Sequence, residues 1–392
     1  MIKSFKVRIY PTKEQEKKLW KHIGACRFIW NHMIDIQQDN YKNGEKYISA
    51  YSMIKMITLL KQDGVHNWLY EVSNTSLCNI CRDLDKAYKG FFKGSYKHPR
   101  YKNRKKSKPS YPVRYESLYF KDDKLLNVEK IGKIKYKTDF DFPIGRKVCK
   151  FVNPRISYKQ TRNIWMLTFG MECESQTPEL TEYPMGIDLG LKDLAIVAFN
   201  NEHTVFHNIN KSKKIRLLEE KKKILQRSIS RKYEESKKRT GKYEKTRNIM
   251  KEEYELRKVH ERLTNIRQDY IHKTTHKLIS MLPSGICMED LDVVGMIKKS
   301  HHKKAKAISD AKWAEFLRQM EYKCEYYGIP FVQVDRFYAS SKTCSNCGAV
   351  KKNLTEKDRI YVCSECGLVI DRDYNAAINL MKHATTGELV AA

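Results

Sequence analysis

The chain has 392 residues, with 76 lysines and arginines against 46 aspartates and glutamates, and its formal net charge is +30 at pH 7. This balance favours a polyanionic partner, most simply nucleic acid, over a membrane surface, for which neither end supplies a basic amphipathic anchor. The start, MIKSFKVRIYP, lacks the apolar segment of a signal peptide, and no apolar run approaches the ~18 residues of a membrane span. We therefore expect a cytoplasmic protein, not associated with a membrane, whose eleven cysteines are mostly reduced.

The N-terminal region predicts one strand and two helices. Alternating apolar residues place a strand over residues 3–10, and Thr12 with Gln15 forms a capping-box pattern that begins a helix. A second helix is expected in SNTSLCNICRDLDKAYKGFF, because its apolar residues recur on one face: Leu77, Ile80, Cys81, Leu84 and Tyr88. Cys78 and Cys81 lie inside this helix with no second pair nearby, so we interpret them as packing residues.

The stretch from Lys86 to Arg114 contains no acidic residue. Tyrosines, a phenylalanine pair and a histidine alternate with its cations, which suits phosphate neutralisation combined with base stacking. The alternative is a solvated, flexible linker. We predict nucleic-acid contacts through five cations of this stretch: Lys86, Lys97, Arg100, Lys102 and Arg104.

The middle of the chain predicts a sheet, then a helical insertion. Residues 115–180 contain short apolar runs separated by turn signals, which indicates a small β-barrel or a curled sheet. Three further strands follow in MGIDLG, LAIVAFN and TVFHN. Residues 211–282 are dense in charge and carry a short heptad seam, so we expect an antiparallel helical hairpin. Two more strands, GICMEDLD and PFVQVDRF, enclose an amphipathic helix closed by Gly328.

Four cysteines form two Cys-x-x-Cys pairs separated by fifteen residues: Cys344, Cys347, Cys363 and Cys366. A glycine follows each pair, Gly348 and Gly367, and suits the tight turns that let four thiolates converge on one Zn²⁺. A redox dithiol is the alternative, but it would need only one pair. Because four protein ligands close the coordination sphere, we predict a structural zinc ribbon.

Two acids interrupt apolar strands, Asp188 in MGIDLGLKD and Glu289 in GICMEDLD. A carboxylate in such a place is costly unless it is paired or binds a cation. Gly186 and Gly190 flank Asp188 and leave room for a backbone or a substrate. Neither segment is specific alone, since an acid at a strand end is more often a cap or an ion-pair partner.

Two further acids, Asp371 and Asp373, stand at the entry to the last helical segment, where one of them is expected to cap the helix. On a basic chain, two strand acids and one acid at a helix start fit a particular chemistry. Three carboxylates can hold two Mg²⁺ ions ~4 Å apart, one activating a water and the other stabilising the 3′ oxygen that leaves a phosphodiester.

Four segments resemble the TnpB (OrfB) proteins of insertion sequences, which are RuvC-type relatives of the type V CRISPR nucleases: GIDLGLKDLAIV, MEDLDVVGM, SSKTCSNCGAV and YVCSECGLVIDRDYNAAINL. The start of the chain and the segments LDKAYKGFF and HPRYKNR are also similar to that family. The resemblance implies a RuvC nuclease of RNase H-like fold with Asp188, Glu289 and Asp373 as its catalytic, Mg²⁺-binding acids. In the D-x-D-x-N pattern of the family, Asp373 stands two before Asn375 and is the metal ligand, which leaves Asp371 as a structural acid.

The resemblance further implies a guide RNA derived from the transposon end and a double-stranded DNA target. It also implies a monomeric ribonucleoprotein in the prokaryotic cytoplasm, at the nucleoid when bound. Base pairing would select the sequence, while the protein reads only a short adjacent motif. Asn79 and Arg82 are the candidate readers, since side chains of that length reach base edges. The alternative is an exposed helix face.

The expected fold class is therefore α/β and multidomain, with the following boundaries: a β-barrel (wedge) domain over 1–9 and 115–180, a helical recognition domain over 10–114, a RuvC domain over 181–340 and 370–382 that contains the hairpin 211–282, an inserted zinc ribbon over 341–369, and a flexible tail over 383–392.

The predicted function is an RNA-guided, Mg²⁺-dependent DNA endonuclease. Two alternatives stay open: an RNA-guided DNA-binding protein that does not cleave, and a transposase or resolvase. The intact acids weigh against the first, and the zinc ribbon before the last acid is not expected in the second. A small type V CRISPR effector is a close variant of the endonuclease.

Overall fold

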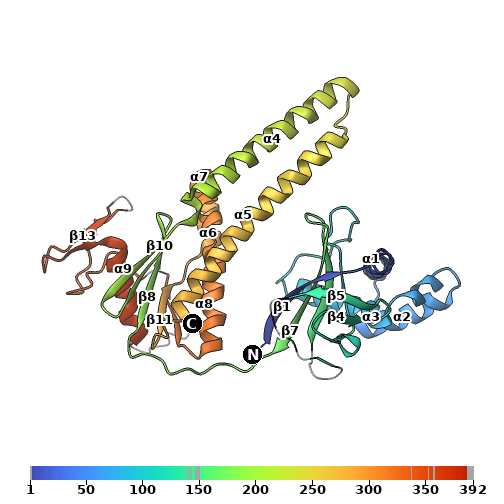
Figure 1. Ribbon diagram of the computed structural model, residues 1–392, viewed down its shortest axis with the longest axis horizontal. Coiled ribbons are helices and arrows are strands. Elements are labelled where there is room, and N and C mark those ends of the chain that lie inside the picture. The colour runs from blue at the N-terminus through green and yellow to red at the C-terminus, as the bar shows by residue number, and fades with distance from the viewer. Residues whose placement is uncertain are drawn as a thin grey trace. The chain divides into compact units, whose positions relative to one another are not determined.

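The computed structural model describes residues 2–138, 140, 142, 144–145, 151–336, 338–351, 353–355 and 358–385, the side chain of residue 385 excepted. The chain forms two compact units, Met1–Glu174 and Ser175–Ala392 (Figure 1). None of the described helices combines the length and the hydrophobicity that a membrane span requires. Of the predicted tail, 383–385 belong to the last helix, and the rest lies outside the described residues.

The first unit is built on an antiparallel seven-stranded sheet in the order β2-β6-β7-β1-β5-β4-β3. As predicted, the N-terminal strand joins the strands of 115–180: Val7 is paired with Leu167 and Ile9 with Tyr136. The end strands are short, three and two residues, and among the described strands they are not paired with each other, so the described sheet is open. The strands are β1 Ile2–Tyr10, β2 Ser110–Pro112, β3 Tyr119–Phe120, β4 Leu125–Val128, β5 Gly132–Lys137, β6 Val152–Lys159 and β7 Ile164–Glu172.

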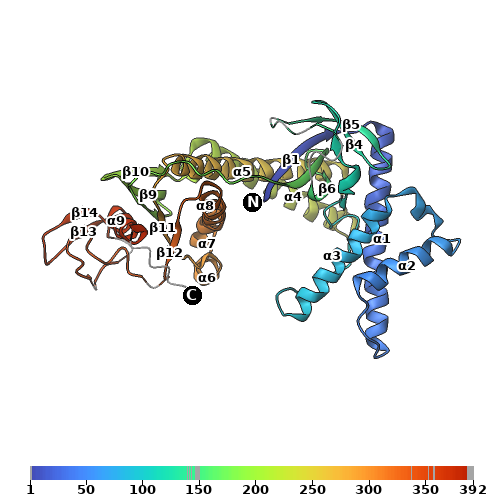
Figure 2. The same ribbon diagram turned by 90° about the horizontal axis from the view of Figure 1, so that it is seen from below.

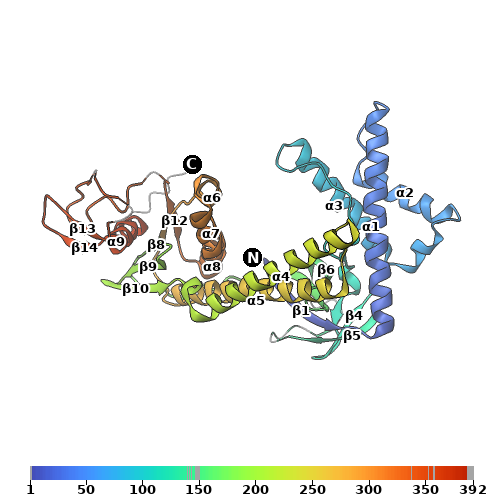
Figure 3. The ribbon, with the colours of Figure 1, turned by 90° about the horizontal axis from the view of Figure 1, so that it is seen from above.

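Three α-helices pack together in the first unit, with α3 against both α1 and α2 (Figure 3). The predicted capping box of Thr12 and Gln15 begins α1, and all five predicted apolar positions of α3 are buried. Sequence periodicity did not predict α2, since only two of its apolar residues, Met53 and Ile57, are buried. The helices are α1 Lys13–Lys42, α2 Ala50–Gln62 and α3 Asn74–Phe92, with short 3₁₀ turns at Asn67–Glu71 and Tyr115–Ser117.

The second unit has a mixed five-stranded sheet in the order β10-β9-β8-β11-β12. The three strands β8, β9 and β10 form an antiparallel meander, and β11 and β12 extend it in parallel with β8. Apolar residues of α5 and α8 cover one face, and α9 covers the other (Figure 2). The strands are β8 Met185–Leu189, β9 Asp193–Phe199, β10 Glu202–His207, β11 Ile286–Glu289 and β12 Phe331–Val334.

The predicted helical hairpin is present between β10 and β11. Its arms meet along a seam that includes Ile215, Val259 and Leu263, and the first arm ends at Gly241 in a left-handed conformation, with φ of 72°. Gly328 closes α8 in the same way, as predicted. Two short basic helices, α6 and α7, were not predicted. The helices and the 3₁₀ turn are η3 Ile209–Lys211, α4 Lys213–Thr240, α5 Arg247–Ile279, α6 Val293–Lys299, α7 His302–Ala311, α8 Trp313–Tyr327 and α9 Arg372–Thr385.

Helix α9 lies directly against the central strand β8 at Gly186. A Cβ atom at this position would stand 2.0 Å from the carbonyl oxygen of Ala377 and 2.3 Å from the backbone nitrogen of Met381, both in α9. Only glycine permits this approach of backbone to backbone. The prediction that Gly186 leaves room for a backbone is confirmed.

Gly186→Ala should therefore destabilise the second unit by about 3 kcal/mol, because the added methyl group meets rigid backbone atoms. Urea denaturation followed by circular dichroism measures this change. The matched control is Gly24→Ala in α1, where an added Cβ meets no atom within 4 Å and the higher helix propensity of alanine predicts no loss. Equal stability of the two variants would contradict the close contact of α9 with β8.

Candidate active site

Strand alternation directs Asp188 and Glu289 toward the face of the sheet that α9 covers. Gly186, two residues before Asp188, meets α9, and Cys287, two residues before Glu289, packs in the cluster that α9 forms with β12. Every second residue of a strand shares a face. The parallel register of β8 and β11 then makes the two acids neighbours at the carboxyl ends of their strands.

Asp373 reaches the same place from the first turn of α9, one helical turn before Ala377, the residue that contacts Gly186. Oδ1 of Asp371 accepts hydrogen bonds from the backbone N–H groups of Asp373 and Tyr374, at 3.0 and 3.1 Å. The prediction that one of the two aspartates caps the helix is thus confirmed for Asp371. The carboxylate of Asp373 is left available for other contacts.

A cleft of about 430 Å³ brings the three acids together, since Asp188, Glu289 and Asp373 all line it. Five cations line the same cleft: Lys192, Lys304, Lys342, Arg359 and Arg372. Basic side chains attract a phosphodiester, while carboxylates repel it unless a cation stands between them. The composition of the cleft therefore suits a phosphate group together with a metal ion.

The charged form of Asp188 is disfavoured in this cleft. Burial raises the pKa of Asp188 well above its usual range, and the neighbouring Glu289 and Asp373 raise it further. Burial also raises the pKa of Glu289, although the hydroxyl of Ser340 donates a hydrogen bond to its Oε1 and opposes the shift. This excess of negative charge is what a divalent cation would relieve, and carboxylate oxygens are the ligands that Mg²⁺ prefers. The three residues fit a Mg²⁺ site.

Two arginines hold the third acid. Nε and Nη2 of Arg372 donate to Oδ1 of Asp373 at 3.0 and 2.7 Å, and Nη1 of Arg359 lies 3.5 Å from Oδ2. In the described part of the chain, the carboxylates do not form a group of three whose oxygens all lie within 4.8 Å. Arg372 and a cation would thus compete for the same oxygen of Asp373.

The four predicted cysteines do form such a group, with all their Sγ atoms within 4.8 Å of one another. Sγ of Cys344 lies 3.6 Å from that of Cys366, and Sγ of Cys347 lies 3.5 Å from that of Cys363. The glycine after each pair is in the left-handed region, as the turns require. With the hairpin of β13 Ile360–Val362 and β14 Val369–Asp371, this cluster fits a zinc ribbon.

Two buried asparagines of α9 tie the ribbon to the cleft. Nδ2 of Asn375 donates to the carbonyl of Thr343 at 2.7 Å, and its Oδ1 accepts from the N–H of Ser345 at 2.9 Å. One turn later, Nδ2 of Asn379 donates to the carbonyl of Ser340 at 2.8 Å. The segment that carries the first cysteine pair is therefore fixed to the helix that carries Asp373.

The residues predicted to contact nucleic acid lie in the first unit. Nη1 of Arg82 donates to Oδ1 of Asn79 at 2.7 Å, so the two act as one group on α3. Nζ of Lys102 lies 3.6 Å from the ring centroid of Trp30, and burial lowers the pKa of this lysine to about 8. The remaining predicted cations are exposed: Lys86, Lys97, Arg100 and Arg104.

Sequence reasoning missed several residues of the cleft. Ser340, Arg359 and Arg372 contact the acids. The only local signal was the position of Arg372 between two aspartates, and nothing in the sequence around Ser340 or Arg359 indicated their role. Trp313 also lines the cleft, and its buried indole N–H has no hydrogen-bond partner among the described residues.

Family models match three parts of the chain. The helix-turn-helix domain of the OrfB proteins of IS605-type elements matches residues 1–46, and the "Probable transposase" model of the same OrfB proteins matches residues 168–300. The Cas12f1-like TNB domain matches residues 313–380. Two curated relatives match nearly the whole chain. One, from Streptomyces pristinaespiralis, is named "Putative RNA-guided DNA endonuclease" and is 29% identical over 97% of this chain and 88% of its own.

The chain belongs to the OrfB (TnpB) family. The second relative, InsQ of Escherichia coli K12, carries the same name and is 28% identical over 99% of this OrfB chain and 95% of its own. Among solved structures, Cas12f1 in a complex with sgRNA and target DNA shares the fold, with a TM-score of 0.60, 14% identity, and coverage of 97% of this chain and 98% of that one. In this OrfB chain, the segment matched by the helix-turn-helix model consists of β1 and the single long helix α1.

Asp188→Asn should stabilise the OrfB protein in the absence of divalent cations. The pKa of Asp188 is raised in the folded state, so the protonated carboxyl stabilises the fold relative to the ionised one. This contribution to stability is fully present below the unfolded-state pKa, and it is lost as the pH rises through the folded-state pKa. At pH 7 to 8 in EDTA, we expect a gain on the order of 1 kcal/mol, or roughly 2–4 °C in melting temperature, that shrinks toward pH 4. The control Asp371→Asn keeps a capping side chain and should change little. A lower melting temperature for Asp188→Asn would contradict the crowding of charge.

Proposed function

We propose that this OrfB protein is an RNA-guided DNA endonuclease that hydrolyses phosphodiester bonds in the cleft of Asp188, Glu289 and Asp373. One observation carries the proposal: three acids from separate elements meet in a cleft that five cations also line. Structural residues seldom converge in this way, and the crowding of carboxylates is tolerated where a divalent cation binds.

The sheet of the second unit supports a RuvC-type, RNase H-like assignment. Three antiparallel strands are followed by two parallel strands, and the first acid stands on the central strand β8 while the second ends its neighbour β11. The third acid begins α9, the helix that crosses this sheet. We infer that Asp188, Glu289 and Asp373 are the metal ligands and that Asp371 acts through the helix cap.

The residues around the acids divide the chemical work. Ser340 fixes the rotamer of Glu289 by its hydrogen bond, and Arg359 and Arg372 hold Asp373 while they also present charge to a phosphate. Lys192 and Lys342 supply further positive charge to the nucleic-acid strand in the cleft. When bound, Mg²⁺ would supply Lewis-acid stabilisation of the phosphate and a nucleophilic water.

Guide RNA and target DNA are the proposed partners, held in a monomeric ribonucleoprotein in the cytoplasm. The net charge of +30 suits the backbone of a guide–target hybrid. The zinc ribbon would hold structure only, because its four thiolates leave no open position for a substrate. The solved Cas12f1 neighbour supports the fold on which this proposal rests.

Alanine at Asp188, Glu289 or Asp373 should lower DNA cleavage by at least about 1,000-fold while RNA binding stays within about 2-fold, because the metal ligands do not contact the guide. The guide is obtained by sequencing the RNA that copurifies with the protein, and cleavage is measured on a matched duplex with Mg²⁺. The control Asp371→Ala removes a helix cap and should keep more activity than Asp373→Ala.

Retained target binding by the unmodified protein without any cutting would favour a guided binder. Strand-transfer products would favour a transposase, and random copurified RNA fragments would count against guidance. The reverse order of Asp371→Ala and Asp373→Ala would show that the two aspartates have been assigned the wrong roles.

Asn79→Ala and Arg82→Ala should each change the short motif that the protein requires beside its target, because the two bonded side chains form one polar group on α3. Cleavage of a library with randomised flanking bases measures the preference, and each lost base contact should cost about 1–3 kcal/mol of discrimination. Lys86→Ala on the same helix is the control and should weaken all flanks alike. An unchanged motif with normal RNA binding would refute this role.

A further inference from the structure

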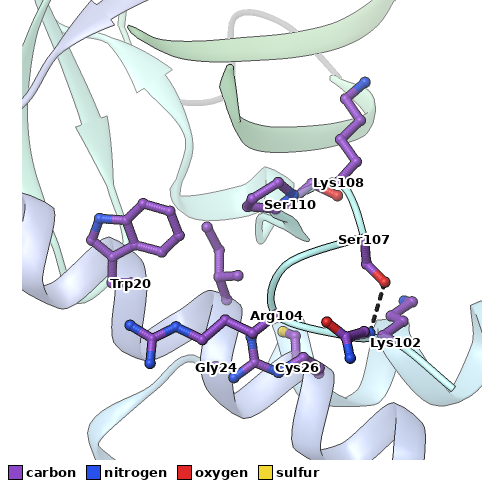
Figure 4. Close-up of a pocket in the computed structure, with 12 residues that line it drawn as sticks. Trp20, Gly24, Cys26, Lys102, Arg104, Ser107, Lys108 and Ser110 are labelled. Carbon is purple, nitrogen blue, oxygen red and sulfur yellow. Dashed lines mark hydrogen bonds between the residues drawn. The ribbon is translucent and has the colours of Figure 1, made fainter. Parts of the chain in front are cut away.

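A second cavity, of about 160 Å³, lies in the first unit between α1 and the loop of residues 102–110 (Figure 4). Four cations line it, Arg27, Lys102, Arg104 and Lys108, and no acidic residue is among its lining residues. Since one water takes about 30 Å³ of liquid volume, the space holds about five waters, enough for one planar ring or one phosphate group.

The cations of this cavity lack counter-ions. Within the described ranges, no ion pair and no side-chain hydrogen bond engages Arg27, Arg104 or Lys108, and Nζ of Lys102 contacts only the ring of Trp30. The carboxylate of Asp83 tends to raise the pKa of Lys102. Its Oδ2 is already paired with Nη1 of Arg155 at 2.7 Å. Clustered cations in a partly desolvated space raise the affinity for an anion.

An aromatic wall stands beside these cations. Trp20 lines the cavity and is 41% exposed, and Tyr158 and Trp165 pack edge-on with its indole at centroid distances of 5.0 and 5.2 Å. Figure 4 shows this indole across the cavity from the loop that carries Ser107 and Lys108. A fixed and exposed indole offers a stacking surface at a low cost in side-chain entropy.

The loop of the cavity is held in place before any ligand arrives. The backbone N–H of Lys102 donates to Oδ1 of Asn31 at 2.8 Å, and its carbonyl accepts from Nδ2 of the same residue at 3.1 Å. The N–H of Asn103 donates to Oγ of Ser107 at 2.8 Å, which closes the following turn. Because these bonds fix the backbone, binding would order only the side chains.

We propose that this cavity is a nucleotide pocket for an unpaired position of a bound nucleic-acid strand: the cavity takes the phosphate, held by Arg27, Arg104 and Lys102, and the base stacks on the exposed part of the Trp20 indole. The proposal rests on the proposed function only for the choice of nucleic acid as the anion. Aromatic and cationic groups together distinguish it from a simple phosphate site, which would not need the indole.

Binding of short single strands tests the pocket. The full-length protein carries Asp188→Asn to prevent cutting and is stripped of RNA with nuclease and high salt. Fluorescence anisotropy then measures its affinity for labelled 12-nucleotide oligouridylate and oligothymidylate. Trp20→Ala should weaken binding roughly 5- to 20-fold, as expected for one stacked base, without changing the salt dependence. Arg104→Gln should weaken binding and lower the slope of log Kd against log salt by about 0.7, as expected for one lost phosphate contact.

Two matched controls separate the pocket from general basicity. Trp68 is 39% exposed but does not line the cavity, and Lys106 is an exposed cation of the same loop that also does not line it. Trp68→Ala and Lys106→Gln should each change the affinity less than 2-fold. If Trp20→Ala weakens binding no more than Trp68→Ala, or Arg104→Gln no more than Lys106→Gln, the pocket is refuted. Trp20→Leu serves if circular dichroism shows that Trp20→Ala is unfolded.

The competitors uridine monophosphate and inorganic phosphate separate a nucleotide pocket from a phosphate site. The nucleotide should displace the oligomer at a concentration at least about 5-fold lower, since one base stacks, and equal displacement would overturn the role of Trp20. A loss seen with one of the two oligomers, or with both, supports the pocket and names the strand. Every protein in this binding test carries Asp188→Asn and cannot cut, so the binding test and the cleavage assay are independent. Unchanged binding by the pocket variants would refute the pocket but not the endonuclease, and absence of cleavage would refute the endonuclease but not the pocket.

Discussion

The contact between α9 and β8 at Gly186 sets the geometry of the second unit. With no Cβ between them, the helix axis comes close enough that Asp373 in its first turn reaches the carboxyl end of the strand that carries Asp188. The parallel register of β8 and β11 places Glu289 beside Asp188. The three acids are therefore brought together by a small residue that itself performs no chemistry, since a backbone approach of this kind tolerates no side chain.

Bringing these carboxylates together is electrostatically unfavourable, and the surrounding residues offset part of this cost. Burial and the two neighbouring acids raise the pKa of Asp188, while Arg372 opposes that shift and the hydrogen bond from Ser340 opposes the shift that burial gives Glu289. The crowded acids lower the stability of the fold, and a bound cation would restore it. Such a conflict is common where function and folding make different demands on the same residues. The thiolate cluster of the same unit differs, because its ligands already lie close together.

The sequence predicted those features whose physics is local. The capping box of Thr12, the buried face of α3 and the cysteine pairs each depend on spacing within one element, and each is confirmed. The order of two strand acids and a helix-start acid on a basic chain suggested a shared metal site, and the family resemblance then selected Asp373 over Asp371 as its third member. The bonds of Asn375, Asn379 and Ser340 were not foreseen, because they join elements that are distant along the chain. Helix α2 was missed because it buries little apolar surface. A β-barrel and a curled sheet both stayed open as predictions, because alternation within strands does not reveal how the end strands pair.

The zinc ribbon has a consequence for how such proteins exchange parts. Ser340, the residue before it, donates a hydrogen bond to Glu289, and strand β14, which leaves it, ends in Asp371, which caps the helix of Asp373. Both junctions of the insertion thus support acids of the catalytic cleft. A recombination event that transplanted the ribbon alone would break two supports of the site at once. The ribbon, its two junctions and α9 therefore form one structural module.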